Sequence, residues 1–254
     1  MNANEILRQR LIELAAAFGL LTRLPVHRFA LPRLTVPADA VWAYPVVGAA
    51  IGAIGGAVYW FTHSLSCPPT LAAICALLAM ILATGAMHED GLADFADGLA
   101  GDTKDRSLSI MRDHQIGTYG VIALVLSLAM RATAVTLIAE PHAVIAALIG
   151  AGAASRLSAV LIMTALPPAR KDGLSASVGS PTAGLAGIAV LLTFVIAWLV
   201  LPFGVSLLLI VSAIVSAIVL GRVALVRLGG QTGDVLGAAA QASECLVLTV
   251  MASL

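Results

Sequence analysis

A short acidic stretch, residues 88–113, carries half of the carboxylate side chains of this 254-residue protein. Its acids are Glu89, Asp90, Asp94, Asp97, Asp102, Asp105 and Asp113. Asp90, Asp94 and Asp97 are spaced by four and three residues, so on an α-helix their side chains leave within about 60° of one another. Carboxylates grouped in this way repel unless a cation lies among them, and oxygen ligands suit hard cations such as Mg²⁺ or Mn²⁺. The spacing therefore predicts a metal site.

The rest of the chain is strongly apolar. Hydrophobic residues make up 60% of it, 11% are charged and the mean hydropathy is +1.00, whereas soluble domains contain about 45–50% apolar residues. This composition indicates a polytopic membrane protein. The formal net charge is zero, which gives no electrostatic indication of a nucleic-acid partner. The three cysteines show no metal-ligand spacing and do not indicate a disulfide framework.

Several apolar runs are long enough to cross about 30 Å of hydrocarbon. They lie at residues 41–61, 69–87, 117–139, 143–166, 184–201 and 205–226, with a weaker seventh at 235–253. Charged side chains interrupt residues 4–22 where a signal peptide would be apolar, so we expect an amphipathic helix on the membrane surface there. The predicted fold is all-α and polytopic: one domain over residues 1–254, with six to seven transmembrane helices and an N-terminal interfacial helix.

Twelve of the fourteen basic residues lie in four segments. One segment precedes the first span, one joins the second span to the third, one follows the fourth span and one lies at the end of the sixth. Their basic residues are Arg8, Arg10, Arg23, Arg28, Arg33, Lys104, Arg106, Arg112, Arg170, Lys171, Arg222 and Arg227. The positive-inside rule makes all four cytoplasmic and places the C-terminus on the far side. The acidic stretch and the loops 167–183 and 227–234 then share the cytoplasmic face, where they could form one site.

Three charged residues are predicted deep inside the spans, away from their ends. Arg131 and Arg156 should face the bundle interior or a water-filled cavity, because a guanidinium in lipid is costly. They could form structural ion pairs or also meet an anionic substrate, since a guanidinium matches phosphate geometry. Glu244 lies about 15 Å along its helix from Asp234. We expect Glu244 within salt-bridge or one-water reach of Arg156 or Arg131, with Arg156 preferred, at the floor of a substrate cavity; the alternative is a shallow helix in which Glu244 reaches water.

An acidic cluster near interior arginines fits metal-assisted transfer of a phosphate group. Carboxylates hold the metal, the metal bridges phosphate oxygens, and Arg or Lys absorbs the remaining charge. His88 could be a general base for a hydroxyl nucleophile, or equally a hydrogen-bonding residue at the membrane boundary. The glycine-rich run 229–234 could cradle a phosphate with its backbone N–H groups. For Asp102 and Asp105, a solvated loop with helix-capping acids is favoured.

Four motifs along the chain have the form and the order of those in a known family. Residues 88–99 reproduce H-x-D-G-L-A-D-x-x-D-G-L, and residues 109–120 fit S-I-M-R-D-x-x-I-G-T-Y-G. Residues 22–25 read T-R-L-P, and residues 230–238 fit G-x-T-G-D-x-L-G-A. In these motifs the chain resembles the cobalamin synthase family, the adenosylcobinamide-GDP ribazoletransferases. The resemblance spans nearly the whole chain, and its acidic motif is highly specific.

The resemblance implies an activity and a setting. The enzyme would join adenosylcobinamide-GDP to α-ribazole or α-ribazole 5′-phosphate, releasing GMP and giving adenosylcobalamin or its 5′-phosphate. It would require Mg²⁺ and lie in the bacterial cytoplasmic (inner) membrane with its active site facing the cytoplasm. Membrane lipid is the further partner, no nucleic acid is expected, and a homo-oligomer is compatible with the sequence.

The resemblance also assigns roles to residues at the matching positions. Asp90, Asp94 and Asp97 would be the metal ligands, and His88, Asp94 and Arg112 would be catalytic. With the interior and loop residues already described, the substrate-binding set is Arg23, Asp113, Thr118, Tyr119, Arg131, Arg156, Arg170, Thr232, Asp234 and Glu244.

The chain departs from the family pattern at two places. Glu89 stands where the pattern has an apolar residue, so we expect it to be an incidental surface acid. Ala240 and Gln241 stand where relatives can carry Asn and Glu, which weakens any catalytic role for these two positions.

Two other functions fit part of the sequence. A Mg²⁺-dependent membrane transferase for lipid alcohols or prenyl diphosphates also uses aspartates. The usual lipid-alcohol motif is D-G-x-x-A-R, but here Gly91-Leu92-Ala93 is followed by Asp94 rather than Arg, and D-D-x-x-D is absent. A cation transporter could bind its ion at the three aspartates. These acids are predicted at the cytoplasmic boundary, however, whereas transporter sites tend to lie near the bilayer midplane.

Overall fold

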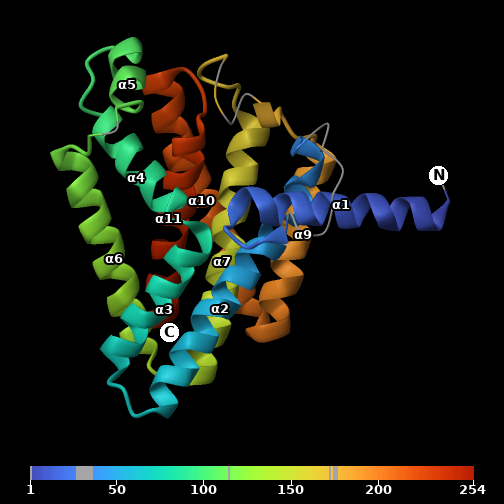
Figure 1. Cartoon of the computed structure of the whole chain (residues 1–254), viewed down its shortest axis with the longest axis vertical. Helices are drawn as coiled ribbons and strands as arrows, with labels where there is room; N and C mark the ends of the chain where they lie inside the picture. The colour runs from blue at the N-terminus through green and yellow to red at the C-terminus, as the bar shows by residue number, and fades with distance from the viewer. Residues whose placement is uncertain (1, 27–36, 114, 172, 174–176) are drawn as a thin grey trace.

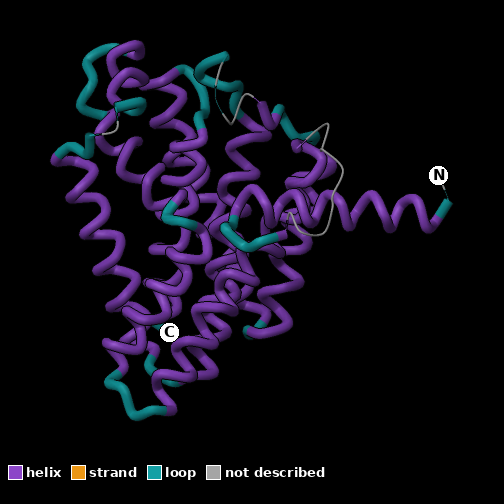
Figure 2. The backbone as a smooth tube through the Cα atoms, in the orientation of Figure 1, coloured by secondary structure: helices purple, strands orange, loops and turns teal. Residues whose placement is uncertain are grey.

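The computed structural model describes residues 2–26, 37–113, 115–171, 173 and 177–254, and all structural statements concern these residues. The helices are α1 (Ala3–Leu21), the 3₁₀ helix η2 (Pro37–Ala43), α2 (Tyr44–Ser64), α3 (Pro69–Thr84), α4 (Met87–Gly98), α5 (Lys104–Ile110), α6 (Thr118–Ile138), α7 (Pro141–Ala165), α9 (Ala183–Val200), α10 (Phe203–Leu228) and α11 (Gly233–Ala252) (Figure 1). Within the described ranges the chain forms helices and loops but no strand (Figure 2). The all-α prediction is confirmed.

Six helical segments are long and apolar enough to cross a membrane. They are residues 38–64, which join η2 to α2, and the helices α6, α7, α9, α10 and α11. The bent pair formed by α3 and α4 would be a seventh. The prediction of six to seven transmembrane helices is therefore confirmed, and the run at 235–253, predicted as weak, forms the full-length helix α11.

The second predicted span, 69–87, is wrong as one continuous helix. α3 ends at Thr84, and Gly85 and Ala86 both have left-handed backbone with φ values of 66° and 60°. Glycine adopts this conformation without steric cost, whereas it is uncommon for alanine. α4 then runs at 88° to α3. The acidic residues 89–97 consequently lie on the second arm of a broken span or re-entrant segment.

α7 is the central helix of the bundle, and 78% of the residues in its most apolar stretch are buried inside the protein. α2 packs along it (Figure 1), and their contact requires glycine. A Cβ atom on Gly48 would overlap the carbonyl oxygen of Gly152, and one on Gly52 would overlap that of Leu148. Small residues of this kind let two backbones approach, which is a main source of helix association in lipid.

α1 lies across the bundle, and its N-terminal part projects to one side (Figure 1). Leu7 and Leu11 on this part are exposed. Nearer the bundle, the buried Glu13 accepts a hydrogen bond from the indole nitrogen of Trp42 at 2.6 Å, which fastens α1 to η2. A helix that projects sideways with exposed leucines has the form expected of the predicted interfacial helix.

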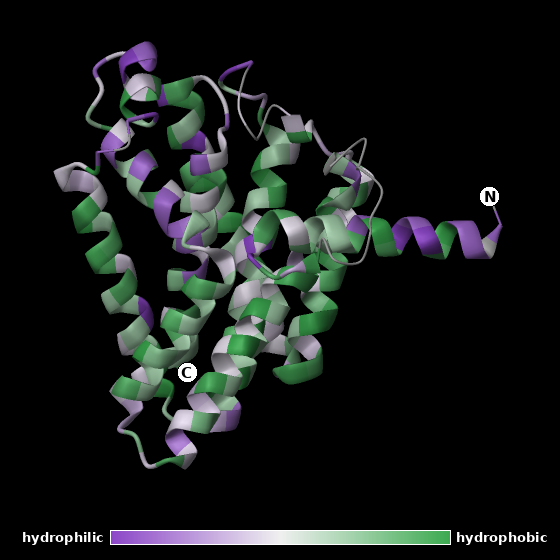
Figure 3. Cartoon of the chain, viewed as in Figure 1, coloured by the Kyte–Doolittle hydropathy of each residue, from purple (hydrophilic) through white to green (hydrophobic). Residues whose placement is uncertain are grey.

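Hydrophilic residues gather at the end of the bundle formed by α4 and α5 (Figure 3). Arg227, at the end of α10, donates hydrogen bonds to the carbonyl oxygens of Leu99 and Gly101. This contact ties the α4–α5 connection to α10. The polar end is therefore held to the bundle by α10 as well as by the chain itself.

Candidate active site

Two aspartates of α4 face a cavity of about 320 Å³ at the polar end of the bundle. Asp90 and Asp94 line it from α4, while Arg112 and Asp113 line it from the segment that follows α5. Asp90 is exposed and Asp94 is half-buried. The structure thus brings together four of the predicted site residues, three carboxylates and one guanidinium. We call this space the acidic cavity.

Asp97, the third predicted metal ligand, has a different environment. Its buried carboxylate accepts hydrogen bonds from the backbone N–H groups of Gly117 at 2.7 Å and Gly120 at 2.9 Å. These amides lie at the N-terminus of α6, where a helix has unpaired donors and favours negative charge. A Cβ atom on either glycine would collide with the Asp97 carboxylate. Both Asp97 oxygens are therefore engaged in capping α6.

The predicted set of three aspartate ligands is consequently not assembled. No group of three or more His, Cys, Asp or Glu side chains in the described part of the chain is arranged to hold a metal ion. Mg²⁺, however, usually takes only one or two carboxylates and completes its shell with waters and phosphate oxygens. Asp90 and Asp94, both lining one open cavity, fit that requirement. Metal binding at this cavity stays a prediction.

His88 does not lie at the acidic cavity. Its side chain is buried and lines a separate space with Tyr44, Met163 and Arg156, on the side of α4 that faces α11. Residues two apart on a helix point about 200° away from each other, which explains why His88 and Asp90 face different cavities. The predicted catalytic residues His88, Asp94 and Arg112 therefore do not line one cavity.

Four charged side chains form a network inside the bundle. Arg131 of α6 donates to Glu244 of α11 at 3.1 Å and to Glu89 of α4 at 3.2 Å, and Arg156 of α7 donates to Glu244 at 3.3 Å. The prediction that Glu244 would reach an interior arginine is confirmed, although Glu244 contacts both arginines rather than Arg156 by preference. Glu244 is not among the residues that line the cavity containing Arg156. The network joins four helices and balances two positive with two negative charges.

The expectation for Glu89 was wrong. Its side chain is buried and bonded to Arg131, and it also accepts a hydrogen bond from the Gln241 amide at 3.0 Å. The sequence around Glu89 does not indicate that it is buried, because the side chain that compensates its charge, Arg131, lies 42 residues away. Gln241, which differs from the family pattern, is thus the neutral partner of this carboxylate.

The loops before α9 and α11 meet, as predicted. The backbone N–H of Ala169 donates to the carbonyl of Gln231 at 2.8 Å, and a Cβ atom on Gly230 would overlap the backbone of this neighbouring loop. Arg170 pairs with Asp234 at 3.3 Å, and the Thr232 hydroxyl donates to the same carboxylate at 3.2 Å. The glycine-rich run therefore packs against the other loop and presents an Arg–Asp pair at its edge.

α4 and α11 cross closely beside this pair. A Cβ atom on Gly91 would lie 3.0 Å from the Asp234 carbonyl oxygen and 3.3 Å from Gly237. The absence of a side chain at Gly91 thus allows the close approach of a neighbouring helix. The crossing therefore places the backbone of Asp234 against Gly91, the residue that follows Asp90. Asp234 and Arg170 therefore lie next to the acidic cavity.

The remaining predicted substrate residues lie at the edges of this region. Thr118 and Tyr119 are exposed in the first turn of α6, beside the cap made by Asp97. Arg23 is exposed, and its side chain packs against Gly85 at the break between α3 and α4. None of the three lines the acidic cavity.

Comparison with known proteins decides the family. The family model described as cobalamin-5-phosphate synthase matches residues 13–252. The chain belongs to this family. An adenosylcobinamide-GDP ribazoletransferase of Bradyrhizobium diazoefficiens is 42% identical over 98% of this chain and 96% of the relative. Proteins of the same name from Mesorhizobium japonicum and Azorhizobium caulinodans are 41% and 40% identical, over 96% and 94% of this chain and 93% and 94% of theirs.

Membership of the cobalamin-5-phosphate synthase family covers every part of the candidate site. The matched residues 13–252 include α4, the acidic cavity, the buried charge network and both loops. No solved structure matches the chain. The predicted resemblance is confirmed over almost the whole length.

Proposed function

We propose that this chain catalyses the nucleotide-loop joining step of cobalamin biosynthesis. The adenosylcobinamide phosphate group of adenosylcobinamide-GDP would be transferred to α-ribazole or its 5′-phosphate, with release of GMP and formation of adenosylcobalamin or its 5′-phosphate. The observation that carries this proposal is 42% identity, over 98% of the chain, to a relative named for the activity. The acidic cavity agrees with it, because it combines carboxylates and a guanidinium as phosphate transfer requires.

In this proposal the diphosphate of the activated corrinoid binds in the acidic cavity. Asp90 and Asp94 would hold Mg²⁺, whose charge, when it is bound, offsets the charge on the phosphate oxygens and on the departing GMP. Arg112 would form paired hydrogen bonds to phosphate oxygens, a geometry that suits guanidinium. The proton of the attacking hydroxyl would pass to a carboxylate of the acidic cavity, and Asp113 would accept it. Asp113 lines this cavity, whereas His88 lines another.

The location follows from the same arrangement. Arg112 lines the acidic cavity, Arg170 pairs with Asp234 beside it, and Arg227 is bonded to the α4–α5 connection. The positive-inside rule would make this end of the bundle cytoplasmic. We therefore place the enzyme in the bacterial cytoplasmic membrane with its site toward the cytoplasm. A large corrinoid with a nucleotide tail could then rest on the membrane edge while its diphosphate enters the cavity.

The activity can be tested with the purified protein in detergent. With adenosylcobinamide-GDP and radiolabelled α-ribazole we expect a labelled cobalamin product and one GMP released per product. The ribazole hydroxyl forms a phosphodiester bond to the phosphorus that carries the corrinoid, and the phosphoanhydride bond between this phosphorus and GMP breaks. A chelator should stop turnover and added Mg²⁺ should restore it. Product formation that is unchanged by the chelator would contradict the proposed Mg²⁺ requirement, while the proposed transferase activity would stand.

The two competing functions predict other results in parallel assays. A lipid-alcohol or prenyl transferase would consume an isoprenoid or lipid substrate, and a cation transporter would carry ions into liposomes. We expect neither signal above that of liposomes or detergent without protein. Ion flux with no cobalamin product would contradict the proposed function.

The orientation predicts which residues an impermeant thiol reagent can reach in intact cells. On a background lacking Cys67, Cys75 and Cys245, a cysteine replacing Asp102 should be labelled only after the cells are opened. His142→Cys, in the first turn of α7 at the other end of the bundle, should be labelled from outside. Labelling of the Asp102 position in intact cells would contradict a cytoplasmic site.

A further inference from the structure

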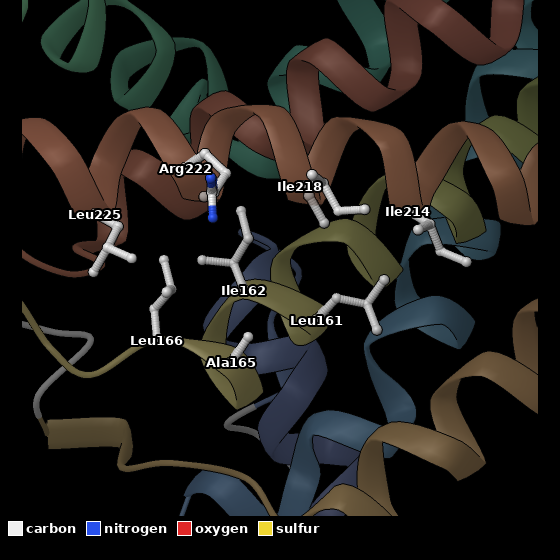
Figure 4. Close-up of a pocket in the computed structure, with 10 residues that line it drawn as sticks. Leu161, Ile162, Ala165, Leu166, Ile214, Ile218, Arg222 and Leu225 are labelled. Atoms are coloured by element: carbon white, nitrogen blue, oxygen red, sulfur yellow. The ribbon is translucent and has the colours of Figure 1, made fainter.

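An apolar groove runs between α7 and α10 on the outside of the bundle. It has a volume of about 480 Å³ and is lined by Leu161, Ile162 and Leu166 of α7 and by Ile214, Ile218 and Leu225 of α10 (Figure 4). Its wall is almost entirely hydrocarbon, and Arg222 is the one charged residue that lines it. Figure 4 shows the Arg222 side chain extending from α10 toward α7, beside Ile162.

Arg222 has no hydrogen-bond or ion-pair partner among the described residues. Its side chain is exposed, unlike Arg131 and Arg156, which are buried and paired. Arg227, five residues further along α10, is bonded to backbone carbonyl groups. Arg222 is therefore a cation at an apolar groove whose compensating negative charge must come from outside this bundle.

The position of Arg222 along α10 suits the membrane boundary. α10 has 26 residues and so is about 39 Å long, against about 30 Å of hydrocarbon. Arg222 lies six residues, or about 9 Å, from the end at Leu228, within a few Å of the headgroup layer. From this depth an arginine can extend its guanidinium to the headgroups. Ile218 and Ile214 continue the groove toward the bilayer centre over about 12 Å.

We propose that this groove is a binding site for an anionic phospholipid. One acyl chain lies along Ile218 and Ile214 between α7 and α10, and the headgroup phosphate pairs with the Arg222 guanidinium. The apolar wall matches a hydrocarbon chain, and the single cation at the boundary end matches a phosphate that carries no compensating positive charge. A zwitterionic lipid fills the same groove but gains less from Arg222, because its own ammonium group offsets the phosphate.

Fluorescence quenching by brominated lipid tests the proposal in the full-length protein. Ile218→Trp, with Trp60 and Trp198 replaced by Phe, puts an indole at the groove, and Trp42 stays as a constant signal from the α1 contact. In vesicles of phosphatidylcholine, brominated phosphatidylglycerol should quench this indole about fivefold more effectively, per mole, than brominated phosphatidylcholine. That factor corresponds to the roughly 1 kcal/mol that one basic residue gains near anionic lipid.

Matched variants identify the source of the preference. Leu191→Trp places an indole on the exposed face of α9, away from the groove, and should be quenched equally by both lipids. Arg222→Gln should abolish the preference at Ile218→Trp, whereas Arg222→Lys should keep most of it. If the Trp variants fold poorly, native mass spectrometry can compare the unsubstituted protein with the single variant Arg222→Gln. Bound phosphatidylglycerol should then appear on the unsubstituted protein only.

Three results would overturn the proposal. Equal quenching by the two lipids at Ile218→Trp, or a preference that survives Arg222→Gln, would show that no headgroup phosphate is bound by Arg222. Efficient disulfide cross-linking of Ile218→Cys between two copies in sparsely loaded vesicles would show that a second copy of this chain covers the groove instead.

Discussion

Asp90→Asn and Asp94→Asn should each lower turnover by at least about 10²-fold while leaving the protein folded. Both carboxylates line the acidic cavity, and a metal bound there contributes several kcal/mol to transition-state stabilisation, which corresponds to this loss or more. Asparagine has the same shape as aspartate but lacks the charge that attracts the ion. The measurement is cobalamin product formed at a series of Mg²⁺ concentrations, together with the thermal unfolding midpoint in detergent.

Asp102→Asn is the matched control, because Asp102 is exposed on the α4–α5 connection and is not among the residues lining the acidic cavity. It should keep full turnover and an unchanged Mg²⁺ dependence. Near-normal turnover in both the Asp90 and Asp94 variants would show that the acidic cavity does not bind a catalytic metal.

Asp97→Asn separates capping from metal binding. The two α6 amides donate to different oxygens of Asp97, and in asparagine one of these oxygens is replaced by an NH₂ group that cannot accept. Asparagine also carries no charge for the helix N-terminus. We expect a loss of stability of about 1–2 kcal/mol, as for other helix caps. Loss of activity at unchanged stability would instead make Asp97 a metal ligand.

Removing Glu244 should give the largest loss of stability in the molecule. Glu244→Met leaves Arg131 and Arg156 buried with one carboxylate between them, and breaking a buried ion pair from one side costs about 3–5 kcal/mol. We expect a large drop in the unfolding midpoint and a low yield of folded protein. The midpoint can be followed by thermal unfolding in detergent or in vesicles.

The double variant Glu244→Met with Arg156→Met tests whether charge balance is the cause. It retains the Arg131–Glu89 pair and restores neutrality. We expect it to be more stable than Glu244→Met alone, with a coupling free energy above about 1 kcal/mol in a double-mutant cycle. Additive losses would mean that packing volume, and not charge, accounts for the effect of Glu244→Met.

Local patterns in the chain were enough to predict the class of protein and most of its elements. Hydropathy over about 20 residues locates α6, α7, α9, α10 and α11, because the thickness of hydrocarbon that a helix must cross is nearly constant. Helical spacing also predicted correctly that Asp90 and Asp94 would share a face. The depth of Glu244 and the cost of an unpaired charge in lipid were sufficient to predict its arginine partners.

Long-range packing decided the other features of the site. The rotational orientation of α4 about its axis depends on partners far along the chain. Asp97 binds backbone amides 20 and 23 residues away. Glu89 binds Arg131, 42 residues away, and Gln241, 152 residues away. Apolar composition runs through Gly85 and Ala86 without interruption, so hydropathy could not show the 88° bend there. His88 and Asp90 are neighbours in sequence but line different cavities, because the crossing with α11 buries one side of α4 and leaves the other open.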